Sequence, residues 1–156
     1  MNRPRIITLW QPYASLCAFN LKRNETRHRL THYRGELFIH AAKRKMTAKD
    51  KTVWNDAIAL AQAAGDTRDF PHVDDLPLGA VLCTSQLIDC IQMTASLCNA
   101  QPTLERLVGD WQPGRYAWPL DKVHAFADPI AWEGQQWIKP APEFLQLQVE
   151  HAIDAW

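Results

Sequence analysis

Three charged side chains lie close together in the segment 20–27, namely Lys22, Glu25 and Arg27. Helical periodicity does not account for their spacing, and two cations that bracket one carboxylate form a polar constellation. A lysine can hold a phosphate as a point charge or act as a base, whereas an arginine binds phosphate through two hydrogen bonds or stacks on a base. Glu25 can orient Lys22 or accept a hydrogen bond from a base edge. The three groups could instead form an internal salt-bridge network.

Aromatic side chains accompany this charge. Trp10 and Tyr13 flank a turn before it, and Tyr33 and Tyr116 lie farther along the chain. Stacking of a nucleobase on an aromatic ring contributes about 1–3 kcal/mol, so such rings can serve as platforms for nucleic acid. The spacing leaves open which rings are platforms and which fill the core. Trp54 recurs with apolar residues at helical spacing and is expected in the core.

A second polar stretch contains His40, Lys43, Arg44 and Lys45. A histidine at the rim of a sheet can transfer protons near neutral pH, but such a residue is more often a half-buried hydrogen-bonding group. The three cations that follow either continue a phosphate-binding track from Lys22 or form a solvated patch at the start of a helix. Both interpretations stay open at this point.

The charge of the chain is unevenly distributed. Residues 1–52 carry twelve Lys and Arg against three Asp and Glu, a net charge of +9, and residues 53–156 carry a net −9. Such a division is typical of a protein with one face for a polyanion. Alternatively, the two parts interleave in the fold and neutralise each other.

Local sequence signals predict the elements that must position these groups. A β-branched run predicts a strand over Arg5–Leu9, and Pro12 begins a helix that runs to about Phe19. Asn20 ends this helix because Asn tolerates the left-handed conformation. A buried strand follows over 35–40, and a capping box at Thr47 begins a helix that ends at Gly65.

The second half of the chain predicts further short elements. After an acidic loop over 66–77, we expect one long or bent strand over Leu78–Met93, a short helix over Pro102–Val108 and a terminal helix over Pro142–Ala155. Two strand pieces are expected between them, over Arg115–Leu120 and Val123–Phe126, with Pro119 at an edge or a bulge. Because the strands cluster, the 156 residues predict one α+β domain built on a small barrel rather than a doubly wound sheet.

Composition excludes several classes of protein. The chain is 47% hydrophobic and 22% charged, as a globular domain is, and no segment has the roughly 20 apolar residues of a membrane span. The apolar run near the N-terminus is cut by Gln11 and Pro12, so a signal peptide is not expected and a cytoplasmic location is. The four cysteines show no CxxC pair or zinc spacing. We therefore expect free thiols, no metal site and no cofactor.

Segment 20–27 resembles the GxKxxExR signature of the ASCH domain, a branch of the PUA-like superfamily of β-barrels. Segments 9–14, 33–43, 76–81 and 114–118 are similar to further blocks of that family, in the family's order. Asn20 stands where the family usually has Gly, and both residues tolerate a left-handed turn. The resemblance covers most of residues 6–120.

The resemblance implies a small, mostly antiparallel PUA-like barrel flanked by helices, with Lys22, Glu25 and Arg27 in a cleft between barrel and helices. It also implies a function on RNA. The first expectation is binding of single-stranded RNA or a nucleotide, and the alternative is a metal-independent ribonuclease that uses the same cleft. Some members hydrolyse N4-acetylcytidine with a Thr nucleophile at the position of Glu25. The neighbouring Thr26 is expected to point to the opposite side of an extended segment, which argues against that activity.

Two sets of candidate residues follow. The candidates for acid–base chemistry are Lys22, Glu25, His40 and Lys43. The candidates for nucleic-acid binding are Trp10, Gln11, Tyr13, Lys22, Arg27, Tyr33, Arg34, Lys43, Arg44, Lys45, Arg115 and Tyr116.

Overall fold

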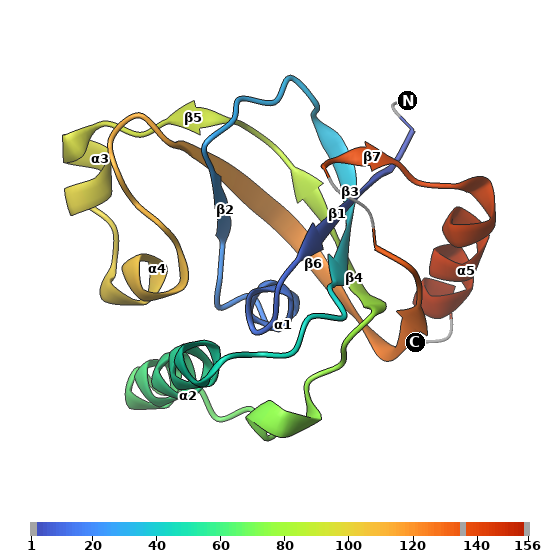
Figure 1. Ribbon diagram of the computed structural model, residues 1–156, viewed down its shortest axis with the longest axis horizontal. Coiled ribbons are helices and arrows are strands. Elements are labelled where there is room, and N and C mark those ends of the chain that lie inside the picture. Colours follow the sequence, from blue (N-terminus) through green and yellow to red (C-terminus); the bar gives the residue numbers. More distant parts are fainter. Residues whose placement is uncertain (1–2, 135–136, 155–156) are drawn as a thin grey trace.

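A computed structural model describes residues 3–134 and 137–154 of the chain. Its elements can be followed by colour from the N-terminus to the C-terminus in Figure 1. The first half contains β1 (Arg5–Leu9), α1 (Tyr13–Ala18), β2 (Asn24–Arg27), β3 (Gly35–Ala41), α2 (Ala48–Ala63) and a 3₁₀ turn, η1 (Val73–Asp75). The second half contains β4 (Ala80–Leu87), β5 (Ile91–Gln92), α3 (Ala95–Asn99), α4 (Thr103–Val108), β6 (Tyr116–Ala131), β7 (Lys139–Pro140) and α5 (Glu143–Asp154).

Local signals place β1, α1, β3 and α2 where the sequence predicts them, whereas β2 and η1 lie in segments for which it predicts no helix or strand. Helix α1 follows Pro12, and Asn20 adopts the left-handed conformation with φ 58°. Helix α2 begins at a complete capping box, in which the Thr47 hydroxyl accepts from the Asp50 N–H and the Asp50 carboxylate accepts from the Thr47 N–H. Gly65, with φ 98°, follows the helix.

The strands form one curled sheet in the order β2-β6-β4-β3-β1-β7, and β5 pairs with β6 on the edge opposite β2, since both strands pair with Tyr116 and Ala117. Only β1 and β3 pair in parallel within the described residues, and the other strand pairs are antiparallel. The sheet curls into a half-barrel, and helices flank it. The predicted α+β class with a mostly antiparallel barrel is confirmed.

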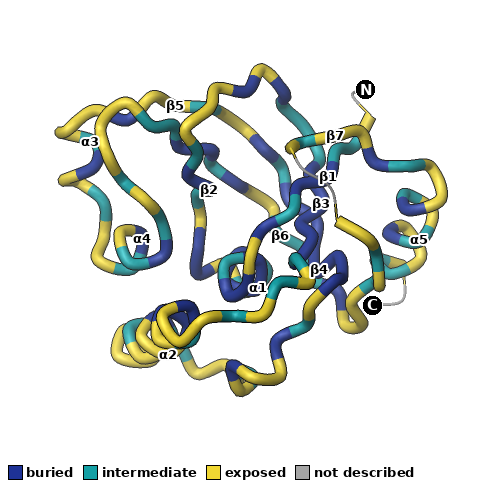
Figure 2. Tube along the Cα trace, viewed as in Figure 1, coloured by how far each residue is buried: buried dark blue, intermediate teal, exposed yellow. Residues whose placement is uncertain are grey.

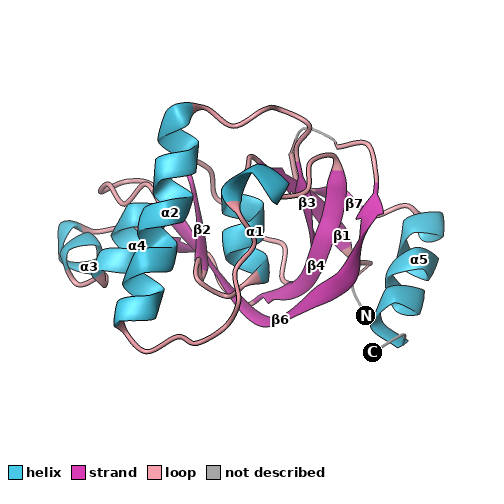
Figure 3. Cartoon of the chain, turned by 90° about the horizontal axis from the view of Figure 1, so that it is seen from below, coloured by secondary structure: helices cyan, strands magenta, loops and turns pink. Residues whose placement is uncertain are grey.

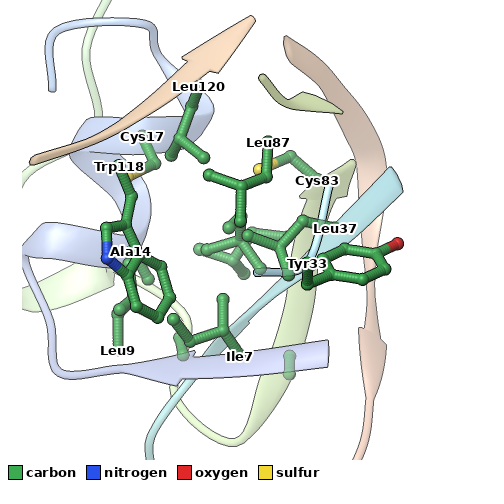
Figure 4. Packing of buried hydrophobic residues seen from close by; sticks show 14 residues of the cluster. Ile7, Leu9, Ala14, Cys17, Tyr33, Leu37, Cys83, Leu87, Trp118 and Leu120 are labelled. Carbon is green, nitrogen blue, oxygen red and sulfur yellow. The ribbon is translucent and has the colours of Figure 1, made fainter. Parts of the chain in front are cut away.

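Helix α1 lies between the sheet and the helices α2 and α4 (Figure 3). Its small residues Ala14 and Cys17 pack into the inner face of the half-barrel, where Figure 4 shows them among Leu9, Leu37 and Leu120. The opposite side of α1 packs against α2 and α4 around the buried Trp54, so the prediction that this residue belongs to the core is confirmed. Helix α5 covers the outer face of the sheet.

The second half differs from the predicted elements in three places, and it also contains the short strand β7, which the sequence does not predict. The strand expected over 78–93 is interrupted between Leu87 and Ile91, so it forms β4 and the short β5. The two expected strand pieces are parts of the single strand β6, which continues through Pro119 and through Lys122 at φ 48° because bulges in its pairing with β4 absorb the irregularity. Helix α3 was not predicted, since five residues give too short a pattern.

Burial separates the two sides of most elements, as Figure 2 shows for the mainly buried α1 and the exposed outer side of α2. All four cysteines are free, and Cys17, Cys83 and Cys98 are buried, as expected. No helix among residues 3–134 and 137–154 is long and apolar enough to cross a membrane. In the same ranges, no three His, Cys, Asp or Glu side chains come together to hold a metal ion.

Candidate functional site

Segment 20–27 lines a cleft of about 560 Å³ between the sheet and the helices. We call it the Lys22 cleft. Trp10 and Tyr13, at the start of α1, supply two aromatic rings to its wall, and Lys22 and Glu25 supply a cation and a carboxylate. Helix α2 contributes Lys49, and the end of α4 and the loop that follows it, residues 107–110, close the opposite side.

The turn at Asn20 directs Lys22 into this cleft. After α1, the N–H groups of Leu21 and Lys22 both bond to the Leu16 carbonyl oxygen, at 2.9 and 3.0 Å. This closure reverses the chain so that β2 runs back along β6. The conformation needed at Asn20 is one that Asn adopts readily, so the turn forms without the family's Gly.

Lys22, Glu25 and Arg27 form one connected network. The Lys22 Nζ donates to the Val108 carbonyl oxygen at 2.8 Å and lies 3.7 Å from Glu25 Oε1. The other carboxylate oxygen, Oε2, accepts from Arg27 Nε at 3.1 Å, and Oε1 also accepts from the Thr26 N–H at 3.0 Å. The sequence left open whether these charges form an internal salt-bridge network or line a cleft. The structure shows both arrangements, because Glu25 pairs with both cations and also lines the cleft.

Exposure differs sharply within the network. Lys22 is only 2% exposed, whereas the Arg27 side chain keeps 26% of its surface in solvent. A buried ammonium has its charge satisfied by Glu25 and Val108 and stabilises the fold. Arg27 is the member of the network that is free to contact a ligand from solvent.

A second hollow continues from the Lys22 cleft. This Arg27 hollow, of about 340 Å³, is lined by Thr8, Trp10, Tyr13, Glu25 and Arg27, together with Leu9. It shares Trp10, Tyr13 and Glu25 with the Lys22 cleft. Because the shared residues are two aromatic rings and a carboxylate, a flat ligand at this point would touch both stacking surfaces and a hydrogen-bond acceptor.

Trp10 is held in place by a cation. The Arg44 guanidinium lies 3.9 Å from the centre of the Trp10 ring, and its Nη1 donates to Asp50 Oδ2 at 3.1 Å. Burial would raise the pKa of Asp50, but hydrogen bonds from Thr47 and Arg44 outweigh it and hold the pKa below its usual value. Asp50 therefore stays ionised and keeps Arg44 against Trp10, which is itself 56% exposed.

Tyr13 presents its hydroxyl group to several charges. Its pKa is raised, first by burial and then by the Asp50 carboxylate, while Arg44 opposes the shift and Glu25 adds to it. The phenol stays protonated at neutral pH and can donate a hydrogen bond. The Lys22 Nζ also lies 5.9 Å from the centre of the Tyr13 ring.

The structure separates Gln11 and His40 from the cleft. Gln11 is fully buried, and its amide bonds to Ser15 and to the Pro77 carbonyl oxygen, so it holds the start of α1 rather than facing a ligand. His40 is 1% exposed, with Nδ1 3.2 Å from the Thr8 hydroxyl and Nε2 2.7 Å from the Trp132 carbonyl oxygen. Burial lowers the pKa of His40, and it lines none of the hollows described here.

Other predicted residues divide between the cleft and its surroundings. Arg115 lines the Lys22 cleft, where its guanidinium donates to the Asp110 and Thr26 carbonyl oxygens. Tyr116, the first residue of β6, packs half-buried against the inner core. Lys43, Arg44 and Lys45 line neither hollow, and of these three consecutive cations Arg44 is the one that contacts a lining residue, through its position over the Trp10 ring.

Tyr33 and Arg34 lie on the connection between β2 and β3. Tyr33 is buried, with its hydroxyl donating to the Glu36 carbonyl oxygen and the Arg5 guanidinium 4.8 Å from its ring centre. Arg34 donates to the Thr31 carbonyl oxygen and pairs with Asp89 at 3.6 Å. That pair and Lys51–Asp74 join the basic and acidic parts of the chain, so some of the charge is neutralised within the fold.

Sequence reasoning missed several residues of the cleft. Lys49 and Asp110 line it, and the Val108 carbonyl oxygen holds Lys22. Glu105, buried behind the cleft, accepts from the Arg23 N–H at 2.7 Å and fixes the start of β2. No motif connects Glu105 or Val108 to segment 20–27, since the bonded pairs Arg23–Glu105 and Lys22–Val108 are 82 and 86 positions apart. Within α4, Glu105 lies beside Arg106 and among apolar residues, which gives no local signal of a role in the cleft.

The sequence predicts that Thr26 points away from the side on which Glu25 lies. In the structure, both residues line the Lys22 cleft. Thr26 lies beside Glu25 there, because the Gly109–Asp110 loop folds over β2 and closes that side. Its hydroxyl oxygen accepts from the Asp110 N–H at 2.9 Å. The hydroxyl is therefore held by the backbone.

Solved structures of similar fold share this architecture. ASCH from Zymomonas mobilis aligns with a TM-score of 0.60 at 13% identity, over 96% of this chain and 94% of that one. Two mutant forms of the same protein align at 12% and 14% identity with TM-scores of 0.60 and 0.58, over 96% of this chain and 98% and 95% of theirs. No protein-family model and no curated protein sequence matches the chain. The likeness to solved structures shows that the chain has the fold of an ASCH domain.

Proposed function

We propose that the Lys22 cleft and the Arg27 hollow bind single-stranded RNA or a nucleotide. The observation that carries this proposal is the meeting of the two hollows at Trp10 and Tyr13, beside Glu25 and Arg27. Aromatic rings stack on bases of any sequence, and an arginine beside them can hold the adjoining phosphate. The fold shared with ASCH domains, which are usually RNA-binding, supports the same function.

The chemistry of each residue suits one part of a nucleotide. Trp10, 56% exposed and backed by Arg44, offers a stacking platform, and the protonated Tyr13 hydroxyl can donate to a base or a phosphate. Arg27 is the partly exposed cation of the network. Glu25, fixed by Arg27 and the Thr26 N–H, can accept a hydrogen bond from an exocyclic amine.

Titration of a fluorescein-labelled oligouridylate, followed by fluorescence anisotropy, tests the proposal. Trp10→Ala should weaken binding by about 5- to 100-fold, since a stacked base contributes about 1–3 kcal/mol. Phe144→Ala is the matched control, because Phe144 is a 65% exposed ring on α5 at the opposite face of the sheet. Equal affinities of Trp10→Ala and wild type, or no binding by wild type, would refute the proposal.

A second candidate function, metal-independent RNA cleavage, is favoured by the Lys22 and Glu25 side chains, whose charged atoms lie 3.7 Å apart in the same cleft. In this reaction the RNA 2′-hydroxyl attacks phosphorus after losing its proton to a base. The 5′-oxygen leaves with a proton from an acid, and a 2′,3′-cyclic phosphate remains. Glu25 is the candidate base and Lys22 the candidate acid.

Incubation of the protein with labelled RNA in EDTA distinguishes cleavage from binding alone. Cleavage should persist in EDTA, disappear on 2′-O-methyl RNA, and fall by about 10²–10⁴-fold in Glu25→Gln, which keeps the shape of the side chain. Activity that survives both Glu25→Gln and the 2′-O-methyl substrate would contradict this candidate.

A further inference from the structure

Two more hollows lie toward the connection between β2 and β3, and the first of them shares a lining residue with the Arg27 hollow. The first, the Trp137 hollow of about 200 Å³, is lined by Arg27, Arg29, Trp118 and Trp137, among others. It shares Arg27 with the Arg27 hollow. In Figure 1 the β2–β3 connection runs along the upper side of the molecule, between the ends of β2 and β3.

The second, the Arg5 hollow of about 390 Å³, is lined by Arg3, Arg5, His32 and Tyr33, together with Thr31 and Pro140. It shares Thr31 with the Trp137 hollow. The four hollows are thus neighbours in a series, in which each member shares at least one lining residue with the next.

Positive charge runs along the whole series. Six of the twelve Lys and Arg of residues 1–52 line it, namely Arg3, Arg5, Lys22, Arg27, Arg29 and Lys49. Arg115 is a seventh cation, and Glu25 and Asp110 are the acids that line the four hollows among the described residues. Much of the basic excess found in the sequence is therefore gathered on one path.

A second aromatic platform lies on this path. Trp137 is 47% exposed, and the Arg29 guanidinium lies 3.7 Å from the centre of its ring. The pairing repeats that of Trp10 with Arg44, at 3.9 Å. The Arg29 carbonyl oxygen accepts from Trp118 Nε1 at 3.2 Å, which anchors this segment to the inner core.

We propose that the four hollows form one track for a single-stranded RNA of several nucleotides, in which Trp137 stacked on Arg29 is a second base platform beyond Trp10. This inference rests on the proposed function and extends it, because it selects an RNA strand over a single nucleotide. Cations between two ring platforms provide the alternation of base and phosphate contacts that a single strand requires.

The test compares two labelled oligouridylates, a dinucleotide and a strand of about ten nucleotides, in anisotropy titrations with the full chain. The longer strand should bind at least about 100-fold more tightly, because two linked platforms act on one ligand. Trp137→Ala should weaken the longer strand by about 5- to 100-fold and leave the dinucleotide unchanged. Trp137→Phe keeps a ring and should restore most of the affinity, which separates stacking from loss of folding.

The outcomes separate this inference from the proposed function. The track is overturned if the longer strand binds no more tightly than the dinucleotide, or if it binds Trp137→Ala and wild type equally. In either case, the effect of Trp10→Ala still tests the proposed function of the Lys22 cleft. An absence of binding by either oligonucleotide to wild type overturns the proposed function and the track together. Phe144→Ala again serves as the exposed-ring control.

Discussion

Two hollows flank the segment that leads into β2, and they differ in what lines them. The Lys22 cleft, on one side, has the rings of Trp10 and Tyr13 and opens onto a path with a large excess of cations. The hollow on the other side, here the Arg68 hollow, has about 490 Å³ and is lined by Arg23, Arg68 and eight other residues.

The Arg68 hollow is nearly as large but chemically balanced. Its two arginines are matched by Asp66 and Glu105, and no Trp, Tyr or Phe lines it. The Arg68 guanidinium makes a close pair with Asp66, with Nη2 and Oδ2 2.7 Å apart. Because the two volumes are similar and the linings differ, the proposal of the Lys22 cleft as the binding site rests on its exposed rings and on the excess of cations beside them, and not on its size.

The largest expected effect contrasts two neighbouring cations, Lys22 and Arg23. Lys22→Ala should reduce the free energy of unfolding by about 1–3 kcal/mol, because it leaves the Val108 carbonyl oxygen without its donor, while Glu25 keeps Arg27. Arg23→Ala, at an exposed position, should change it by less than about 0.5 kcal/mol. Urea denaturation measures both. Similar small changes in the two variants would show that the Lys22 network is not a structural element.

The salt dependence of RNA binding sharpens the comparison. Each phosphate neutralised lowers the slope of log K against log salt by about 0.7 for a single strand. Arg27→Gln combined with Arg29→Gln should make the slope shallower by roughly 1.4. The matched control is the double variant Arg23→Gln with Arg68→Gln in the Arg68 hollow, which should leave the slope unchanged. If both double variants made the slope equally shallow, the assignment of the track would be contradicted.

The sequence predicted the fold best where signals are local. The capping box at Thr47, the left-handed Asn20 and the β-branched run of β1 each specify an element within a few residues. Strand β6 could not be predicted as one piece, because Pro119 and the left-handed Lys122 break its local pattern while pairing with β4 carries it through. Tertiary pairing there overrides local preference.

The candidate site was predicted in part for the same reason. Segment 20–27 carries its own signature, so Lys22, Glu25 and Arg27 could be named, but their burial could not. Lys22 is buried because the Val108 carbonyl oxygen, 86 positions away, receives its ammonium. His40 was named as a candidate acid or base from its place in a strand, whereas its contacts with Thr8 and Trp132 come from elsewhere in the chain.

The next prediction concerns the pH dependence of stability and involves His40, which lines neither the Lys22 cleft nor the Arg68 hollow. Burial lowers its pKa in the folded state, so the unfolded chain binds a proton that the folded chain does not. The free energy of unfolding should therefore fall as the pH drops below the ordinary histidine value of about 6.5, and level off below the folded pKa. His40→Gln should flatten this part of the curve. An unchanged pH profile in His40→Gln would show that another group titrates there.

The smallest expected effect concerns the support of Trp10. Arg44→Ala removes the guanidinium that lies over the ring and should weaken RNA binding by about 2- to 5-fold, the equivalent of roughly 0.5–1 kcal/mol for an exposed cation–π contact. Lys45→Ala removes an exposed cation that lines neither the Lys22 cleft nor the Arg27 hollow, and should have no such effect. Equal losses would instead favour a general phosphate-binding patch over 43–45.

Photo-crosslinking of an oligonucleotide that contains 4-thiouridine, followed by mass spectrometry of the peptides, tests the central claim most directly. Binding in the Lys22 cleft and the Arg27 hollow should give crosslinks to Trp10 or Tyr13, and competition with unlabelled oligouridylate should remove them. Competed crosslinks to peptides of the Arg68 hollow, with none at Trp10 or Tyr13, would contradict the claim.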